Sequence, residues 1–186
     1  MNRWVSWLAG AALVAAAGGV VAVTPSTDTR NGPFLVHGTV SDTVASRELV
    51  VTVDSASFAD RVTVSDDDWQ AEGNWLVVEL SAAARQTEVE ASMRLATLVV
   101  DGREFIASER PSTSLIGTEL RVGIDTHGML AFQLPTDLEP SDAELRLAGP
   151  HSTPRLDDVI VVHLDLESAA RERTIDILEP TIGESS

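Results

Sequence analysis

Hydrophobic and polar positions beyond residue 33 follow a strand pattern. Short apolar runs recur roughly every 8–15 positions between turn residues, and no stretch keeps apolar residues at helical spacing over three turns. This spacing predicts one all-β domain over residues 34–179, a sandwich or barrel of about 8–10 strands. The candidate segments for these 8–10 strands are residues 34–40, 49–53, 61–64, 75–80, 93–100, 103–107, 120–124, 129–134, 143–147, 159–166 and 174–178.

Turn residues predict two hairpins within this domain. Asp101-Gly102 lies between two apolar runs, and type I′ turns favour this pair because both central positions need positive φ. Residues 125–128 are expected to join strands 120–124 and 129–134 in the same way. Residues 75–80 carry apolar side chains on both faces, which is typical of a strand covered on both sides.

The N-terminus predicts one hydrophobic helix. Residues 4–23 carry no charge and, at 1.5 Å per residue, span about 30 Å, the thickness of a bilayer core. Arg3 precedes the run and favours an N-terminus inside the cell. The side chains expected to hold the membrane are Trp4, Trp7, Leu8, Leu13, Val20, Val21 and Val23.

A cleaved signal peptide is the alternative to a retained anchor. Ala15-Ala16-Ala17 and Val20-Val21-Ala22 offer small-residue cleavage sites. The predicted organisation is therefore a signal anchor or signal peptide over residues 1–23, a polar linker over 24–33, the β-domain over 34–179 and a flexible tail over 180–186. In either case the β-domain is expected outside the cytoplasm.

Composition narrows the function classes. The chain of 186 residues has a formal net charge of −16 and no cysteine. An acidic surface repels phosphates, so nucleic-acid binding is not expected. The absence of cysteine excludes disulfides, cysteine-bound zinc and a lipid anchor on an N-terminal cysteine.

Three segments resemble a known family. Trp75-Leu76-Val77-Val78-Glu79-Leu80, Leu98-Val99-Val100-Asp101-Gly102-Arg103-Glu104-Phe105 and Gly128-Met129-Leu130-Ala131-Phe132-Gln133-Leu134-Pro135 resemble a bacterial family of exported domains of unknown function. That family is similar in fold to the secreted immunoprotective antigen of mycobacteria. The resemblance implies an immunoglobulin-like β-sandwich and no catalytic residue. Many relatives are lipoproteins, and this chain departs from them by lacking the cysteine.

Candidate metal ligands are sparse. Asp66, Asp67 and Asp68 form a weak calcium candidate, because calcium prefers clustered carboxylates, but the glycine and closing glutamate of an EF-hand loop are missing. The four histidines, His37, His127, His151 and His163, lack the spacing of a metal-binding pair, although distant histidines can converge in a fold. The sequence predicts no cofactor.

Catalytic motifs are also missing. The chain has no G-x-S-x-G, S-x-x-K, G-x-G-x-x-G or Walker sequence. Trp75 is expected in the core, while Trp69 is left open between core and partner contact.

The sequence therefore favours a non-catalytic interaction module, anchored in the membrane and facing away from the cytoplasm, with a protein partner in the cell envelope. One alternative is a secreted soluble protein, ligand-binding or antigen-like, released by signal cleavage. A further alternative is an enzyme or a calcium-binding accessory domain.

Overall fold

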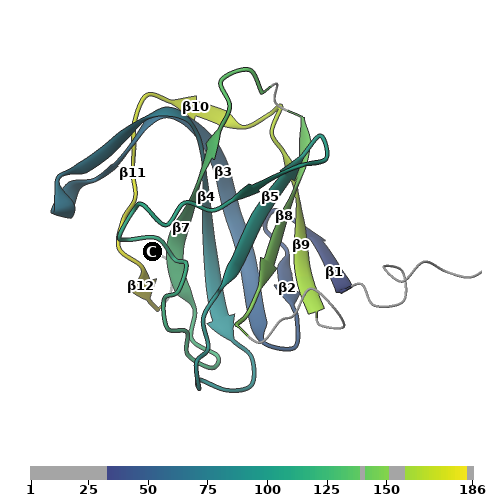
Figure 1. The fold of residues 1–186 in the computed structure, drawn as a ribbon. Coiled ribbons are helices and arrows are strands. Elements are labelled where there is room, and N and C mark those ends of the chain that lie inside the picture. Colours follow the sequence, from purple (N-terminus) through teal and green to yellow (C-terminus); the bar gives the residue numbers. More distant parts are fainter. Residues whose placement is uncertain (1–32, 139–140, 151–157, 184–186) are drawn as a thin grey trace, which may run out of the picture. The chain divides into compact units, whose positions relative to one another are not determined.

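Two β-sheets face each other across an apolar core (Figure 1). A computed structural model describes residues 33–138, 141–150 and 158–183. The prediction of an all-β sandwich is confirmed for these residues. The predicted hydrophobic helix over residues 4–23 lies outside them. No helix in the described part of the chain is long and apolar enough to span a bilayer.

The described elements are β1 (Phe34–Thr39), β2 (Thr43–Ala45), β3 (Leu49–Val64), the 3₁₀ turn η1 (Ser65–Asp67), β4 (Trp69–Ala84), β5 (Leu95–Val100), β6 (Arg103–Ile106), β7 (Thr126–Leu134), β8 (Asp142–Ala148), β9 (Asp158–Asp165), β10 (Ala170–Glu172), β11 (Ile175–Asp176) and β12 (Thr181–Ile182). The count exceeds the predicted 8–10 because β10, β11 and β12 are only two or three residues long.

Sheet A has the strand order β1-β9-β8-β5-β6. Strand β1 is parallel to β9, and the other pairs are antiparallel. The hairpin predicted at Asp101-Gly102 is confirmed between β5 and β6, and these two residues have φ angles of 49° and 72°. Both are positive, as a type I′ turn requires.

Sheet B is built on a long hairpin. Its order is β10-β3-β4-β7-β12, and β2 and β11 also pair with β3. Strands β3 and β4 each have 16 residues, and their far end extends away from the two sheets (Figure 1). The sequence predicts two short strands where β3 is one. The pairing slips between Val53 and Ser55, so the β-bulge at Asp54 interrupts the alternation without ending the strand.

The second predicted hairpin is wrong. Strand β7 pairs with β4 over Asn74–Ala82, and not with residues 120–124. Those residues form only isolated bridges, while Leu120, 2% exposed, is buried as a loop side chain. Pairing with a distant strand therefore overrides the local turn signal.

Apolar side chains fill two separate clusters. The larger lies between the sheets and includes Leu76, Val78 and Leu80. Trp75 is fully buried, as predicted, but alternation along β4 points it to the opposite face of sheet B. The members of this second cluster are Ala59, Val62, Val64, Ala71, Trp75, Val77, Ala131 and Ile177.

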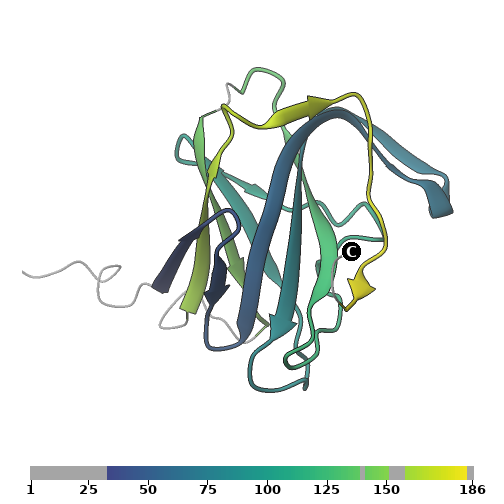
Figure 2. The ribbon, with the colours of Figure 1, turned by 180° about the vertical axis from the view of Figure 1, so that it is seen from behind.

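A C-terminal strap, residues 170–182, closes the second cluster. It follows the outer edge of β3 as β10 and β11 and then pairs with β7 as β12. Figure 2 shows the strap in yellow, passing the base of the extended hairpin. Residues 180–186 are predicted as a free tail, yet Thr181–Ile182 form β12 and Gly183 N donates to Asp125 O at 2.9 Å.

Hydrogen bonds fix the middle of the strap. Ile177 N donates to Thr63 O at 2.8 Å, and Thr113 Oγ1 donates to Ile177 O at 2.6 Å. Asp176 accepts from Ser65 N, Ser65 Oγ and Thr63 Oγ1 at 3.0, 2.7 and 2.8 Å. The hydroxyl donors Ser65 and Thr63 hold the pKa of Asp176 below its usual 3.8.

Truncating Ile177 should open the second cluster. Ile177 is 1% exposed, whereas its neighbour Leu178 is 58% exposed. We expect Ile177→Ala to lower the free energy of unfolding by about 2–5 kcal/mol, and Leu178→Ala by no more than about 0.5 kcal/mol. Urea unfolding followed by tryptophan fluorescence measures both, and equal losses would contradict the packing described here.

Candidate functional site

The two sheets differ in how their edges are covered. On sheet B, β2, β10 and β11 cover β3. Strand β7 is covered by β12 and by loop amides, because Ser108 N donates to Ala131 O and Leu115 N to Met129 O. On sheet A, no strand among the described residues pairs with the outer edge of β1 or β6. Unpaired edge groups can accept another strand, so sheet A is the candidate for contact with a partner.

One hydrogen bond shows which backbone N–H groups of β1 point away from β9. Thr39 N donates to Asp42 Oδ2 at 2.9 Å, outside the pairing with β9. Because N–H groups alternate sides along a strand, Leu35 N and His37 N also face the open edge. The edge therefore presents two backbone donors.

The outer face of sheet A carries exposed apolar side chains. On this face Leu35 is 45%, Leu95 40% and Ile106 76% exposed. Phe34 at the start of β1 is 61% exposed but alternates with Leu35, so it belongs to the other face of the strand. Leu35 lies opposite Val159, and Leu95 lies opposite Ala148. Ala148, Val159 and Val161 form a small buried cluster on this face. We define the sheet A surface as Leu35, His37, Leu95, Glu104, Ile106, Glu144, Arg146 and His163.

Charged side chains cross the same face. Arg146 donates to Glu144 Oε2 through Nε at 3.2 Å and Nη2 at 2.8 Å. Its Nη1 lies 3.7 Å from Glu104 Oε1. The hydrogen bonds from Arg146 hold the pKa of Glu144 below its usual 4.5, and His163 and His37 favour the ionised form in the same sense.

Two histidines meet at the end of this charged row. His37 Nδ1 lies 3.2 Å from His163 Nε2, and the ring planes differ by 9°. The parallel register places His37 opposite Val161 and Thr39 opposite His163, so the histidines are diagonal neighbours. His127 lies on β7, and His151 falls outside the described residues. The sequence left this convergence open because it depends on a register between distant strands.

Gly38 allows β1 to reach its position. A Cβ atom on Gly38 would lie 2.2 Å from Val44 Cγ2 on β2, well inside van der Waals contact. Val44 is 5% exposed and belongs to the main core. The close approach explains why the smallest residue is found here in β1.

The calcium candidate lies away from the sheet A surface, at the end of the long hairpin. Asp66 and Asp67 belong to η1, and Asp68 follows it with a φ of 51°. The hydroxyl of Ser112 donates to Asp67 Oδ2. Among the described residues, no group of three or more histidines and acids is arranged to hold a metal ion. The structure therefore adds no ligand to these three carboxylates.

Trp69 and Trp75, the two tryptophans within the described residues, both take part in packing. Trp75 is fully buried. Trp69 is half-buried, and the guanidinium of Arg110 lies 5.4 Å from its ring centre and 6.0 Å from that of Trp75. This cation–π arrangement assigns both rings to the packing of the second cluster.

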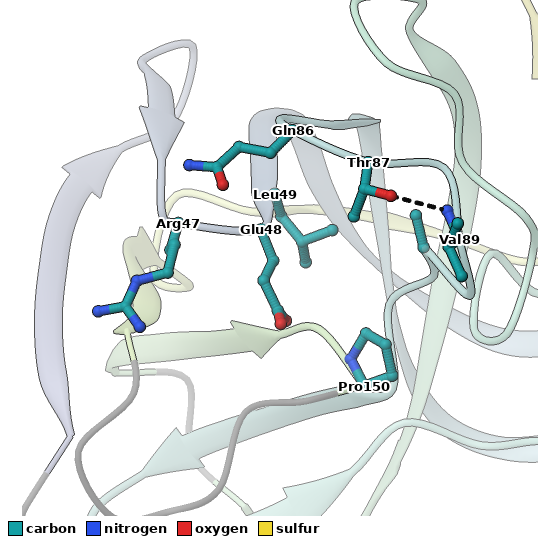
Figure 3. A pocket seen from close by; sticks show the side chains of 8 residues that line it. Arg47, Glu48, Leu49, Gln86, Thr87, Val89 and Pro150 are labelled. Carbon is teal, nitrogen blue, oxygen red and sulfur yellow. Dashed lines mark hydrogen bonds between the residues drawn. The ribbon is translucent and has the colours of Figure 1, made fainter.

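One cavity opens at the end of the sandwich where β3 begins (Figure 3). Its volume is about 150 Å³. Figure 3 shows Glu48 extending toward Pro150. Ligand pockets usually hold about 300–1,000 Å³, so this cavity is small for an organic ligand. The lining residues are Arg47, Glu48, Leu49, Gln86, Thr87, Val89, Ala91 and Pro150.

A second hollow of about 420 Å³ lies beside the long hairpin. Three of the side chains that line it, Asp60, Arg61 and Glu72, form ion pairs. Arg61 pairs with Glu72, and Arg171 pairs with Asp60 at 3.2 Å beside the hollow. These pairs bridge strands, which gives them a structural role.

Comparisons with known proteins identify no family. No protein-family model and no curated protein matches the chain. Among solved structures, the chain is similar to an uncharacterized β-sandwich protein from Clostridium difficile 630, with 10% identity and a TM-score of 0.45. The match covers 76% of this chain and 99% of that one. The assignment of a β-sandwich therefore rests on the strand pairings within this chain, and the similarity to the other protein gives no information about function.

Adding one methyl group at Gly38 should displace β1. We expect Gly38→Ala to lower the free energy of unfolding by roughly 1–3 kcal/mol, because the new Cβ overlaps Val44. In a Val44→Ala background the same change should cost less, because the overlapping methyl is gone. A double-mutant cycle by urea unfolding measures this coupling, and strictly additive losses would contradict the close approach.

Proposed function

We propose that this chain is a non-catalytic interaction module, anchored in the cell membrane and facing away from the cytoplasm, which binds a protein partner through sheet A. The observation that carries the proposal is the unequal covering of the two sheets. Sheet B has partners along both outer edges, whereas β1 exposes its edge and apolar side chains among the described residues.

The proposal includes an immunoglobulin-like topology, as the motif resemblance implies. In that fold, strands C, F and G form one sheet and A, B, E and D the other. The order β5-β8-β9 corresponds to C-F-G, and β3-β4-β7 corresponds to A-B-E. Strand β12, from the C-terminal strap, then occupies the place of strand D. This correspondence supports the family resemblance at the level of topology alone.

Strand addition is the binding mode that fits β1. An extended partner segment would accept hydrogen bonds from the outward amides of Leu35 and His37. Side chains of the sheet A surface would then select the sequence of the partner. Beside the open edge, Leu35 gives this surface an apolar contact and His37 gives it a polar one.

The membrane anchor rests on the uncharged residues 4–23. Release by signal cleavage, giving a secreted ligand-binding or antigen-like protein, is the second candidate. Mass spectrometry of membrane and medium fractions separates the two. An intact Met1 in the membrane fraction supports the anchor, whereas an N-terminus near Val23 in the medium supports release.

The proposal gives the chain no catalytic role. The net charge of −16 argues against a nucleic-acid partner. No cofactor is assigned.

Blocking the open edge should abolish partner binding. Leu35→Pro removes one outward donor, and proline is tolerated on an edge strand, so the domain should remain folded. Leu35→Ser removes the apolar side chain but keeps the donor. Crosslinking in intact cells from a photoreactive residue at Phe34, which is 61% exposed at the start of β1, should capture one reproducible partner with the native chain, less with Leu35→Ser and none with Leu35→Pro.

A photoreactive residue at Leu178 is the matched control, because it is also exposed but lies in the strap, between the two strands β11 and β12 that pair with sheet B. Capture of bulk envelope proteins alone, or equal capture from both positions, would contradict the assignment of sheet A as the binding surface.

A further inference from the structure

We propose that His37 and His163 form a binding site for a divalent transition metal ion of the zinc, nickel and copper group, which links β1 to β9. The site stands on the geometry of the two imidazoles. It does not depend on the partner proposed above.

The separation of the two ring nitrogens fits a shared metal ion. His37 Nδ1 and His163 Nε2 are 3.2 Å apart. Imidazole nitrogens lie about 2.0–2.1 Å from zinc, so two of them 3.2 Å apart subtend roughly 100–105° at the metal. That angle falls between the octahedral and the tetrahedral values. The separation of the two nitrogens therefore matches that of two ligands on one ion.

Ring orientation and exposure allow the ion to enter. The ring centres are 5.3 Å apart, which is farther than the nitrogens, so the rings meet by their edges. Both side chains are exposed. Small ring rotations can then aim both lone pairs at one point, and water can complete the coordination.

The present contact already requires a bridging proton. Two imidazole nitrogens at 3.2 Å hydrogen-bond only if one carries hydrogen and the other does not. Metal binding replaces that proton, because a ligating imidazole must be free at the coordinating nitrogen. The ion therefore occupies a position that the two rings now bridge by hydrogen bonding.

Neighbouring charges favour a cation. The carboxylate of Glu144 on β8 lies opposite His163. Arg146 forms ion pairs with both Glu144 and Glu104, so this group of three side chains keeps a net negative charge. Thr39 and Val161, the register partners of the two histidines on β1 and β9, are uncharged. Two nitrogen donors select zinc, nickel or copper over calcium or magnesium, which prefer oxygen ligands.

A metal ion bound by both histidines would hold β1 against β9. Among the described residues, β1 pairs only with β9 in sheet A, so a metal ion held by both strands stabilises that pairing. Because the ion binds the folded arrangement, stability rises with metal concentration.

The test uses the full-length chain treated with a chelator and then titrated with Zn²⁺. The native chain and the control His127→Gln should bind one Zn²⁺ at this site and melt at a higher temperature as Zn²⁺ is added. His37→Gln and His163→Gln should each bind roughly tenfold more weakly or worse, because loss of a mere supporting residue already costs about 10–100-fold. Equal Zn²⁺ affinity in all four proteins, or no binding by the native chain, would overturn the proposal.

Pulsed electron paramagnetic resonance with Cu²⁺ tests the native chain without any substitution. Two imidazole nitrogens coordinated to one Cu²⁺, reduced to one in each single variant, is the expected result. A spectrum from the native chain with one imidazole or none overturns the proposal, even if a variant fails to fold.

Discussion

Backbone hydrogen bonding along the outer edge of β3 constrains the rest of this domain. The strand has 16 residues, and β2 covers only residues 50–52 of its edge. Strand β10 covers residues 57–59 of the same edge, and β11 covers residues 62–63. The chain therefore returns from β9 to the other sheet, and on the way to β7 it adds Ile177 to the buried cluster that contains Trp75. One requirement, the pairing of exposed backbone, thus produces both the strap and the second apolar cluster.

The same requirement leaves the two sheets unequal. The strap pairs with the edges of sheet B, and within the described residues no further strand pairs with the outer edge of β1. An edge protected by its neighbours is closed to partners, whereas an uncovered edge with apolar side chains is suited to strand addition. The histidine pair lies on this strand. Partner binding and metal binding, as proposed here, would therefore both act on the placement of β1.

Local sequence signals predicted the elements that depend on local chemistry. Asp101-Gly102 fixes its hairpin through positive φ, and the alternation in residues 159–166 predicts β9. Other features depend on distant pairing. The bulge at Asp54 interrupts the alternation inside β3, so the sequence predicts two short strands where the structure has one. Residues 120–124 form a loop because β7 pairs with β4 instead. The His37–His163 contact arises only from the parallel register of β1 and β9, which periodicity within either strand does not encode.

Amide hydrogen exchange of the full-length chain tests the unequal covering of the sheets most directly. Thr63 faces the strap, because its carbonyl accepts from Ile177 N, so its amide should exchange slowly. The amides of Leu35 and His37 face the open edge of β1 and should exchange at rates close to those of an unprotected strand. Protection of Leu35 and His37 equal to that of Thr63 would show that the edge of β1 is covered, and would contradict the account.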